Sequence, residues 1–114
     1  MQYALLIYDV PGNYDRLSDD ERHAVFGEYF AISQAPGVYG GAQMQPVETA
    51  TTIRVDDDAV LTTDGPFADT KEFLGGFYLV EADDLDAATE VAKRVPAARM
   101  GGAVEIRPLV EQPS

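Results

Sequence analysis

Strand-like and helix-like segments follow one another in this chain in an order that few folds accommodate. Runs of strand-forming residues alternate with two segments in which apolar residues recur with helical spacing. We expect strands over residues 3–8, 38–45, 51–55, 59–63, 76–82 and 104–107, and helices that begin after Ser18 and after Asp83 or Asp84. This β-α-β-β-α-β order with an extended central hairpin predicts an α+β, ferredoxin-like fold, in which an antiparallel sheet carries both helices on one face.

Both expected helices have recognisable ends. Ser18 and Glu21 form a capping-box pattern before the first helix, and Pro36 ends it. Lys93 and Arg94 are expected in the last turn of the second helix, where the helix dipole favours cations. Apolar residues gather on one face of each helix: Val25, Phe26, Tyr29, Phe30 and Ile32 in the first, and Leu85, Ala88, Val91, Ala92 and Val95 in the second.

Two helices cover only one face of such a sheet, yet two of the expected strands are apolar at successive positions. We expect one face to carry Tyr3, Leu5, Ile7, Phe77 and Leu79, and the other to carry Ala4, Leu6, Tyr8, Tyr78 and Val80. An uncovered apolar face needs a partner. We therefore predict a homodimer that packs sheet to sheet, with a concave pocket beneath the sheet as the alternative.

The composition is that of one globular domain. The 114 residues are 46% hydrophobic and 25% charged, and we expect a single domain over residues 1–110 with a tail at 111–114. No apolar run approaches the roughly 20 residues of a membrane helix, and residues 1–3 lack the basic start of a signal peptide. Cysteine is absent, which excludes disulfides and thiolate chemistry. These features predict a cytoplasmic protein.

Acidic residues outnumber basic ones by 20 to 8, which makes the net charge −12. A phosphate backbone is repelled by such a field, and no Lys/Arg cluster overcomes it locally. We therefore expect no direct contact with nucleic acid. The charge either keeps the protein soluble or attracts a cationic partner.

The segment from Asp64 to Glu72 carries more functional groups than a connection between two strands needs. A turn-forming Asp64-Gly65-Pro66 is followed by an aromatic, an acid, a hydroxyl and an adjacent Lys-Glu pair. This density of polar and aromatic groups makes the segment a candidate site for a small-molecule ligand.

The chain resembles the YCII-related superfamily, in the branch named for its Asp-Gly-Pro-Phe motif. The likeness runs from about Tyr3 to Pro108, and it includes residues 5–8, 50–54, 64–72, 74–79, 84–88 and 104–108. It implies a ferredoxin-like fold assembled as a dimeric α/β barrel. It also implies an acid/base pair of a helix histidine and an aspartate, the latter matched by Asp64. The single histidine, His23, stands about one helical turn before the usual position, which Phe26 occupies here.

Asp64 is the first candidate catalytic residue. As a general base it would sit in an apolar setting formed by Phe67 and Tyr8, which would raise its pKa. As a turn residue its carboxylate would instead accept backbone N–H bonds. His23 lies at the edge of the apolar arc of its helix, where it either points toward the cavity of Asp64 or is a half-exposed helix residue.

Six residues are candidate ligand contacts: Tyr8 and Phe67 beside Asp64, and Arg54, Thr70, Lys71 and Glu72. Arg54 is either an anion anchor or a cross-strand partner of Glu105 or of a neighbouring acid. Thr70 either caps a turn or bonds to a ligand. Lys71 and Glu72 either orient a substrate or are solvated loop residues.

Other chemistries lack their residues. A single His without Cys disfavours a zinc site, residues 56–58 lack calcium-loop spacing, and no serine triad or phosphate-binding loop is present. We predict no metal and no cofactor. The function is then either small-molecule acid/base catalysis, of lyase, isomerase or hydrolase type, or a non-catalytic ligand-binding module. The resemblance links the second to transcription through sigma-factor-associated genes and a protein partner. A simple dimerisation protein is the third possibility.

Overall fold

The computed structural model describes residues 1–66 and 70–111. Its strands are β1 Gln2–Asp9, β2 Val38–Gln43, β3 Thr51–Asp56, β4 Ala59–Asp64, β5 Phe73–Glu81 and β6 Ala103–Pro108. Its helices are α1 Asp19–Ser33 and α2 Leu85–Ala92, and two short 3-10 helices are η1 Val47–Thr49 and η2 Pro96–Arg99.

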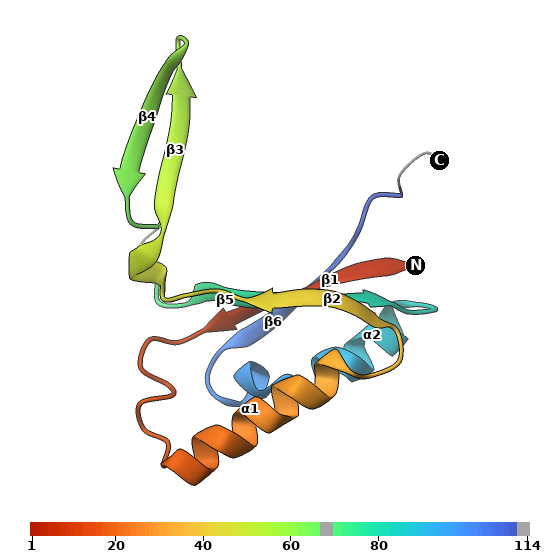
Figure 1. Cartoon of the computed structure of the whole chain (residues 1–114). Helices are drawn as coiled ribbons and strands as arrows, with labels where there is room; N and C mark the ends of the chain where they lie inside the picture. The colour runs from red at the N-terminus through yellow and green to blue at the C-terminus, as the bar shows by residue number, and fades with distance from the viewer. Residues whose placement is uncertain (67–69, 112–114) are drawn as a thin grey trace.

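Four strands form the main sheet, in the order β2-β5-β1-β6, with every neighbouring pair antiparallel. Figure 1 shows both helices on one side of this sheet, and the β3–β4 hairpin rising from its other side. This arrangement confirms the predicted ferredoxin-like α+β fold with an extended central hairpin.

The helix ends explain where each helix begins and stops. The Oγ of Ser18 accepts a 3.1 Å bond from the N–H of Glu21, whose Oε1 accepts a 3.0 Å bond from the N–H of Ser18, so the predicted capping box is confirmed. Asp84 caps α2 through a 2.9 Å bond from Ala87. The prediction that Lys93 and Arg94 lie in the last turn of α2 was wrong, because the helix ends at Ala92. The chain must become extended before a proline, and Val95 precedes Pro96.

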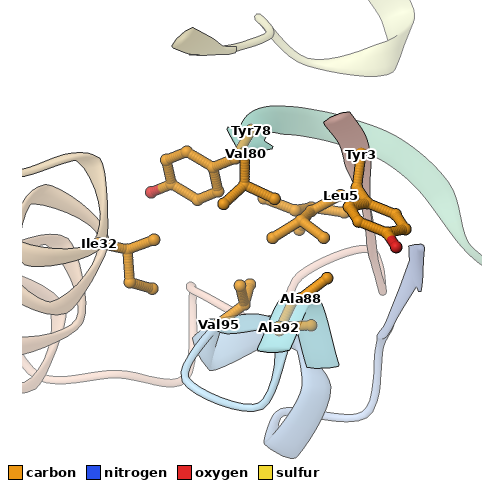
Figure 2. Close-up of a cluster of buried hydrophobic side chains, with 10 residues drawn as sticks. Tyr3, Leu5, Ile32, Tyr78, Val80, Ala88, Ala92 and Val95 are labelled. Atoms are coloured by element: carbon orange, nitrogen blue, oxygen red, sulfur yellow. The ribbon is translucent and has the colours of Figure 1, made fainter. Parts of the chain in front are cut away.

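The core lies between the sheet and the two helices (Figure 2). Cross-strand pairing sets Tyr3 opposite Val80 and Leu5 opposite Tyr78, so these four residues share the helix-covered face. The helices complete the core from the other side, with Ile32 of α1, Ala88 and Ala92 of α2, and Val95 just after α2. Leu5, Ile32 and Val95 are no more than 1% exposed.

The register corrects the predicted division of the two faces. On β5, Phe77 pairs with Leu6, and Leu79 pairs with Ala4, so these residues lie on the face opposite the helices. From the sequence, Phe77 and Leu79 are instead expected with Tyr3, Leu5 and Ile7, which lie on the face that the helices cover. Alternation within one strand defines its two sets of residues, but only the pairing of two strands decides which sets share a face.

The face opposite the helices carries the half-buried Leu6, Tyr8, Phe77 and Leu79. The hairpin that rises on the same side is far more exposed (Figure 1). Ile53, Val55 and Val60 share one of its faces, because Val55 pairs with Val60 and Ile53 with Thr62. They are 63%, 67% and 65% exposed. We call the sheet face opposite the helices, together with the hairpin that rises from it, the open side of the molecule.

Candidate active site

A cavity of about 340 Å³ lies between α1 and the helix-covered face of the sheet. Helix α1 contributes three aromatic residues and a serine to its lining, and Tyr14 closes it from the loop before the helix. The sheet contributes residues 7, 9, 41–43 and 75–78. The cavity is therefore mostly apolar and aromatic, with few polar groups, which is the usual make-up of a small-molecule site.

Asp9, the last residue of β1, is the charged residue in the lining. It is only 7% exposed. The β1–β5 register slips between Ile7 and Tyr8, which pair with Gly76 and Leu74 and leave Gly75 as an extra residue on β5. A Cβ at position 75 would lie 2.4 Å from the Oδ2 of Asp9. The missing side chain of Gly75 thus leaves the space that the buried carboxylate occupies.

Burial raises the pKa of the Asp9 carboxyl above its ordinary value, because desolvation disfavours the charged form. Hydrogen bonding to Asn13 and Tyr14 opposes this rise. The Nδ2 of Asn13 lies 3.4 Å from the Oδ1 of Asp9, which makes it a long, weak donor. Asp9 is thus a buried carboxyl group whose charged form is disfavoured by the apolar cavity.

Two tyrosines form a hydrogen-bonded chain that ends at Asp9, and a third is hydrogen-bonded to one of them. The hydroxyl oxygens of Tyr14 and Tyr29 lie 3.3 Å apart, and the hydroxyl of Tyr78 donates a 2.7 Å bond to the carbonyl of Tyr29. Burial raises the pKa of Tyr14 and, more strongly, that of Tyr29, and the charge of Asp9 adds to both. The phenols therefore stay protonated and available as hydrogen-bond donors. A chain Tyr29–Tyr14–Asp9 links a proton acceptor to two donors.

Comparison with known proteins gives a family. The model of the YCII-related domain matches residues 1–112. The chain belongs to the YCII-related family. An uncharacterised protein of Rhizobium meliloti is 34% identical over 114 residues, which cover 96% of this chain and 92% of that protein.

A solved structure resembles this YCII-related chain in fold. It is the 5-chloro-2-hydroxyhydroquinone dehydrochlorinase of Burkholderia phenoliruptrix in complex with 2,5-dihydroxybenzoquinone. The two chains are 17% identical, the TM-score is 0.54, and the match covers 98% of this chain and 96% of the other. At this identity the likeness shows the shared fold.

Of the residues predicted at the Asp-Gly-Pro-Phe segment, those that the structure describes lie outside the cavity lining. Asp64 is the exposed last residue of β4 and pairs with Thr51, while Arg54 on β3 pairs with Leu61. The cross-strand neighbour of Arg54 is thus Leu61 and not Glu105, which belongs to the other sheet. The turn after Asp64 is held by its backbone, since Gly65 donates a 2.6 Å bond to the carbonyl of Ala50.

Other predicted residues also lie away from the cavity. Tyr8 is half-buried on the open side of the sheet. Thr70 donates to the carbonyl of Glu72, and Lys71 and Glu72 are both exposed. Phe67 lies outside the described residues. In α1 the exposed His23 is not part of the lining, whereas Phe26, at the position where the family resemblance expects a histidine, lines the cavity.

Sequence reasoning did not select Asp9 or Tyr14, and treated Tyr29 and Tyr78 as adequately explained by core packing. The strand expected over residues 3–8 leaves Asp9 outside it, next to the turn-forming Pro11 and Gly12. The signal was its place at the end of a strand that is apolar on both faces. Such a strand is central, so its last residue lies in the interior.

The described part of the chain offers no metal site of the usual kind. Within residues 1–66 and 70–111, no group of three or more His, Cys, Asp or Glu side chains lies close enough together to hold an ion. In the same residues, neither helix combines the length and apolarity needed to cross a bilayer.

Proposed function

We propose that this YCII-related protein is a small-molecule enzyme that works by acid/base catalysis, with Asp9 as the base. The observation that carries the proposal is the carboxylate of Asp9, 7% exposed and aimed at a cavity of about 340 Å³. A carboxylate whose pKa is raised toward the working pH is a stronger base than an ordinary one.

The simplest reaction that these groups support is an elimination. The Asp9 carboxylate takes a proton from the substrate carbon, and the freed electron pair forms a double bond as the neighbouring bond to the leaving group breaks. The hydroxyl of Tyr14, with Tyr29 behind it, donates a hydrogen bond to the charge that develops on a substrate oxygen. The dehydrochlorinase among the structural neighbours is compatible with lyase chemistry in this fold.

A thermal-shift screen of small molecules, followed by a turnover assay of each hit, tests the proposal. We expect Asp9→Asn to lower turnover by about 10²- to 10⁴-fold, because it removes the base while keeping the shape of the side chain. Tyr14→Phe should lower it less. A hit that stabilises the protein and is never converted would contradict the enzyme and favour a non-catalytic ligand-binding module.

Asp64 and the residues predicted with it form a second candidate locus for the same function. These are His23, Tyr8, Arg54, Phe67, Thr70, Lys71 and Glu72. Asp64→Asn in the same assays separates the two loci, since it removes an acid at the hairpin and leaves the cavity lining intact. Loss of turnover in Asp64→Asn, with activity retained in Asp9→Asn, would move the base to the hairpin.

We also infer a homodimer in which the open sides of two copies pack together. The support is the apolar sheet face and the exposed Ile53, Val55 and Val60 of the hairpin. A two-stranded hairpin is marginally stable without further packing. Light scattering at micromolar concentration should report twice the mass of one chain. Val60→Lys should lower this measured mass, because it places a charge in the proposed interface. A monomer at that concentration would contradict the dimer. A cytoplasmic location remains a prediction from the composition, and the absence of direct nucleic-acid contact remains a prediction from the charge of −12.

A further inference from the structure

We propose that the cavity admits its ligand only in the uncharged state, as a planar ring with a hydroxyl group, and rejects carboxylates and phosphates. The inference concerns the cavity of the proposed function and rests on it for the role of Asp9. It is a statement about binding, however, and binding can be measured without turnover.

The walls of the cavity suit a flat molecule. On one side α1 presents the rings of Phe26, Tyr29 and Phe30, and on the other the sheet presents backbone at positions 41, 75 and 76, all three of which are glycine. Phe26 and Phe30 are 45% and 68% exposed, although both are large apolar side chains beside a cavity. A ring inserted here would cover apolar surface that is now in contact with water, and aromatic faces pack well against one another.

The size of the cavity leaves room for such a ring and its substituents. A cavity of about 150 Å³ lined by apolar side chains already holds benzene. The cavity beside Asp9 measures about 340 Å³. A single substituted ring therefore fits.

The charges of the residues around the cavity determine whether a neutral or an anionic ligand binds. None of the lining residues in the described chain is Lys, Arg or His, so no cation in the wall would compensate an anion. Arg22 contacts the backbone of Tyr14 but is already engaged, since it donates a 3.2 Å bond to the carbonyl of Tyr14 and lies 3.6 Å from Asp19. A bound carboxylate would instead face the buried carboxylate of Asp9, and two like charges in one site disfavour each other.

A hydroxyl on the ring complements the polar groups that are present. The carboxylate of Asp9 accepts hydrogen bonds, and the amide of Asn13 donates to it only at a long 3.4 Å. A ligand O–H would provide a shorter, charge-assisted bond. Tyr14 and Tyr29 can donate to a second oxygen on the ring.

Calorimetry at pH 7 with three probes of similar size tests the inference: phenol is planar and neutral, benzoate is planar and anionic, and cyclohexanol is neutral but not planar. We expect phenol to bind at least about tenfold more tightly than benzoate. Phe30→Ala should weaken phenol by roughly two- to tenfold and leave cyclohexanol less affected.

Asp9→Asn should reverse the charge selection, because the amide has no charge to repel an anion. Benzoate should gain affinity and phenol should lose some. Asp83→Asn removes one exposed negative charge far from the lining and is the matched control, so it should change neither ligand. Far-UV circular dichroism and the melting temperature establish that each variant folds.

Two outcomes would overturn the inference: benzoate binding as tightly as phenol in the unchanged protein, or cyclohexanol binding as tightly as phenol. Neither bears on whether Asp9 is a base. Conversely, phenol binding with the expected selectivity, together with no turnover of any hydroxylated ring, would leave the binding inference standing and contradict the enzyme.

Discussion

Apolar residues on the two sides of the central sheet differ strongly in their exposure to solvent. On the helix side, Leu5, Ile32 and Val95 are almost completely buried, and Asp9 is buried with them. On the open side, the hairpin residues Ile53, Val55 and Val60 are about two-thirds exposed. The side that the chain covers by itself can hold a desolvated carboxylate, whereas the described residues of the hairpin are too exposed to desolvate one. The burial of a carboxyl group therefore indicates where acid/base chemistry is supported better than its distance from the Asp-Gly-Pro-Phe segment does.

The largest stability effect should separate the two sides directly. Leu5→Ala removes a fully buried side chain and should lower the free energy of unfolding by about 2–5 kcal/mol. Ile53→Ala on the exposed hairpin should change it by less than about 0.5 kcal/mol in a monomer. Urea unfolding at several protein concentrations measures both. A large, concentration-dependent loss in Ile53→Ala would show that a partner buries the hairpin, and the contrast would then hold only within one chain.

The next effect concerns the space beside Asp9. Gly75→Ala should cost about 1–3 kcal/mol and force the carboxylate out of its position, because the new Cβ would lie 2.4 Å from Oδ2. The pKa of Asp9, followed by carbon NMR, should then fall toward its ordinary value. Gly27→Ala is the matched control, since no atom lies within 4 Å of its added Cβ and an exposed helical alanine is favourable. An unchanged Asp9 pKa in Gly75→Ala would contradict the role assigned to this glycine.

A smaller contrast is expected at the helix beneath the cavity. Ser18→Ala removes the side-chain half of the capping box and should lower the free energy of unfolding by about 1 kcal/mol. Because α1 carries one wall of the cavity, ligand affinity should fall with it. Ser18→Asp keeps an N-cap acceptor and should restore both. If alanine proves neutral, the start of α1 is held by its packing and not by its cap.

The pH dependence of stability should distinguish the two aspartates. Burial raises the folded-state pKa of Asp9, so the folded protein binds its proton more tightly than the unfolded chain does. The resulting penalty is absent below the unfolded pKa and grows as pH rises through the folded pKa. Asp9→Asn should therefore raise the melting temperature at pH 7 and leave it nearly unchanged at pH 3. Asp64→Asn, on the exposed strand, is the matched control and should change the melting temperature little.

The smallest effect lies at the hairpin tip. Asp57 and Asp58 adopt φ angles of 47° and 67°, in the left-handed region that glycine occupies without strain. Asp58→Gly should relieve this strain and one of three adjacent charges, and raise the hairpin's local stability by about 0.5–1 kcal/mol. Amide hydrogen exchange across β3 and β4 measures that change. Faster exchange in Asp58→Gly would show that the acidic tip stabilises the turn.

Local patterns predicted most of the fold. The strand segments, the capping box at Ser18, the cap at Asp84 and the extended hairpin all follow from interactions between residues near one another in the chain. The site was not predictable in the same way. Asp64 stood out because its neighbours in sequence are chemically rich, while Asp9 is followed by ordinary turn residues.

The sequence by itself determined the element order, the YCII-related family and the presence of more apolar surface than two helices can cover. Only the tertiary structure decided which strand faces join, that β5 has an extra residue at Gly75, and that Asp9 is thereby buried beside Tyr14. The physical reason is that desolvation depends on everything packed around a group. The cavity that Asp9 lines is formed by α1, β2 and β5, which are distant from it in the chain.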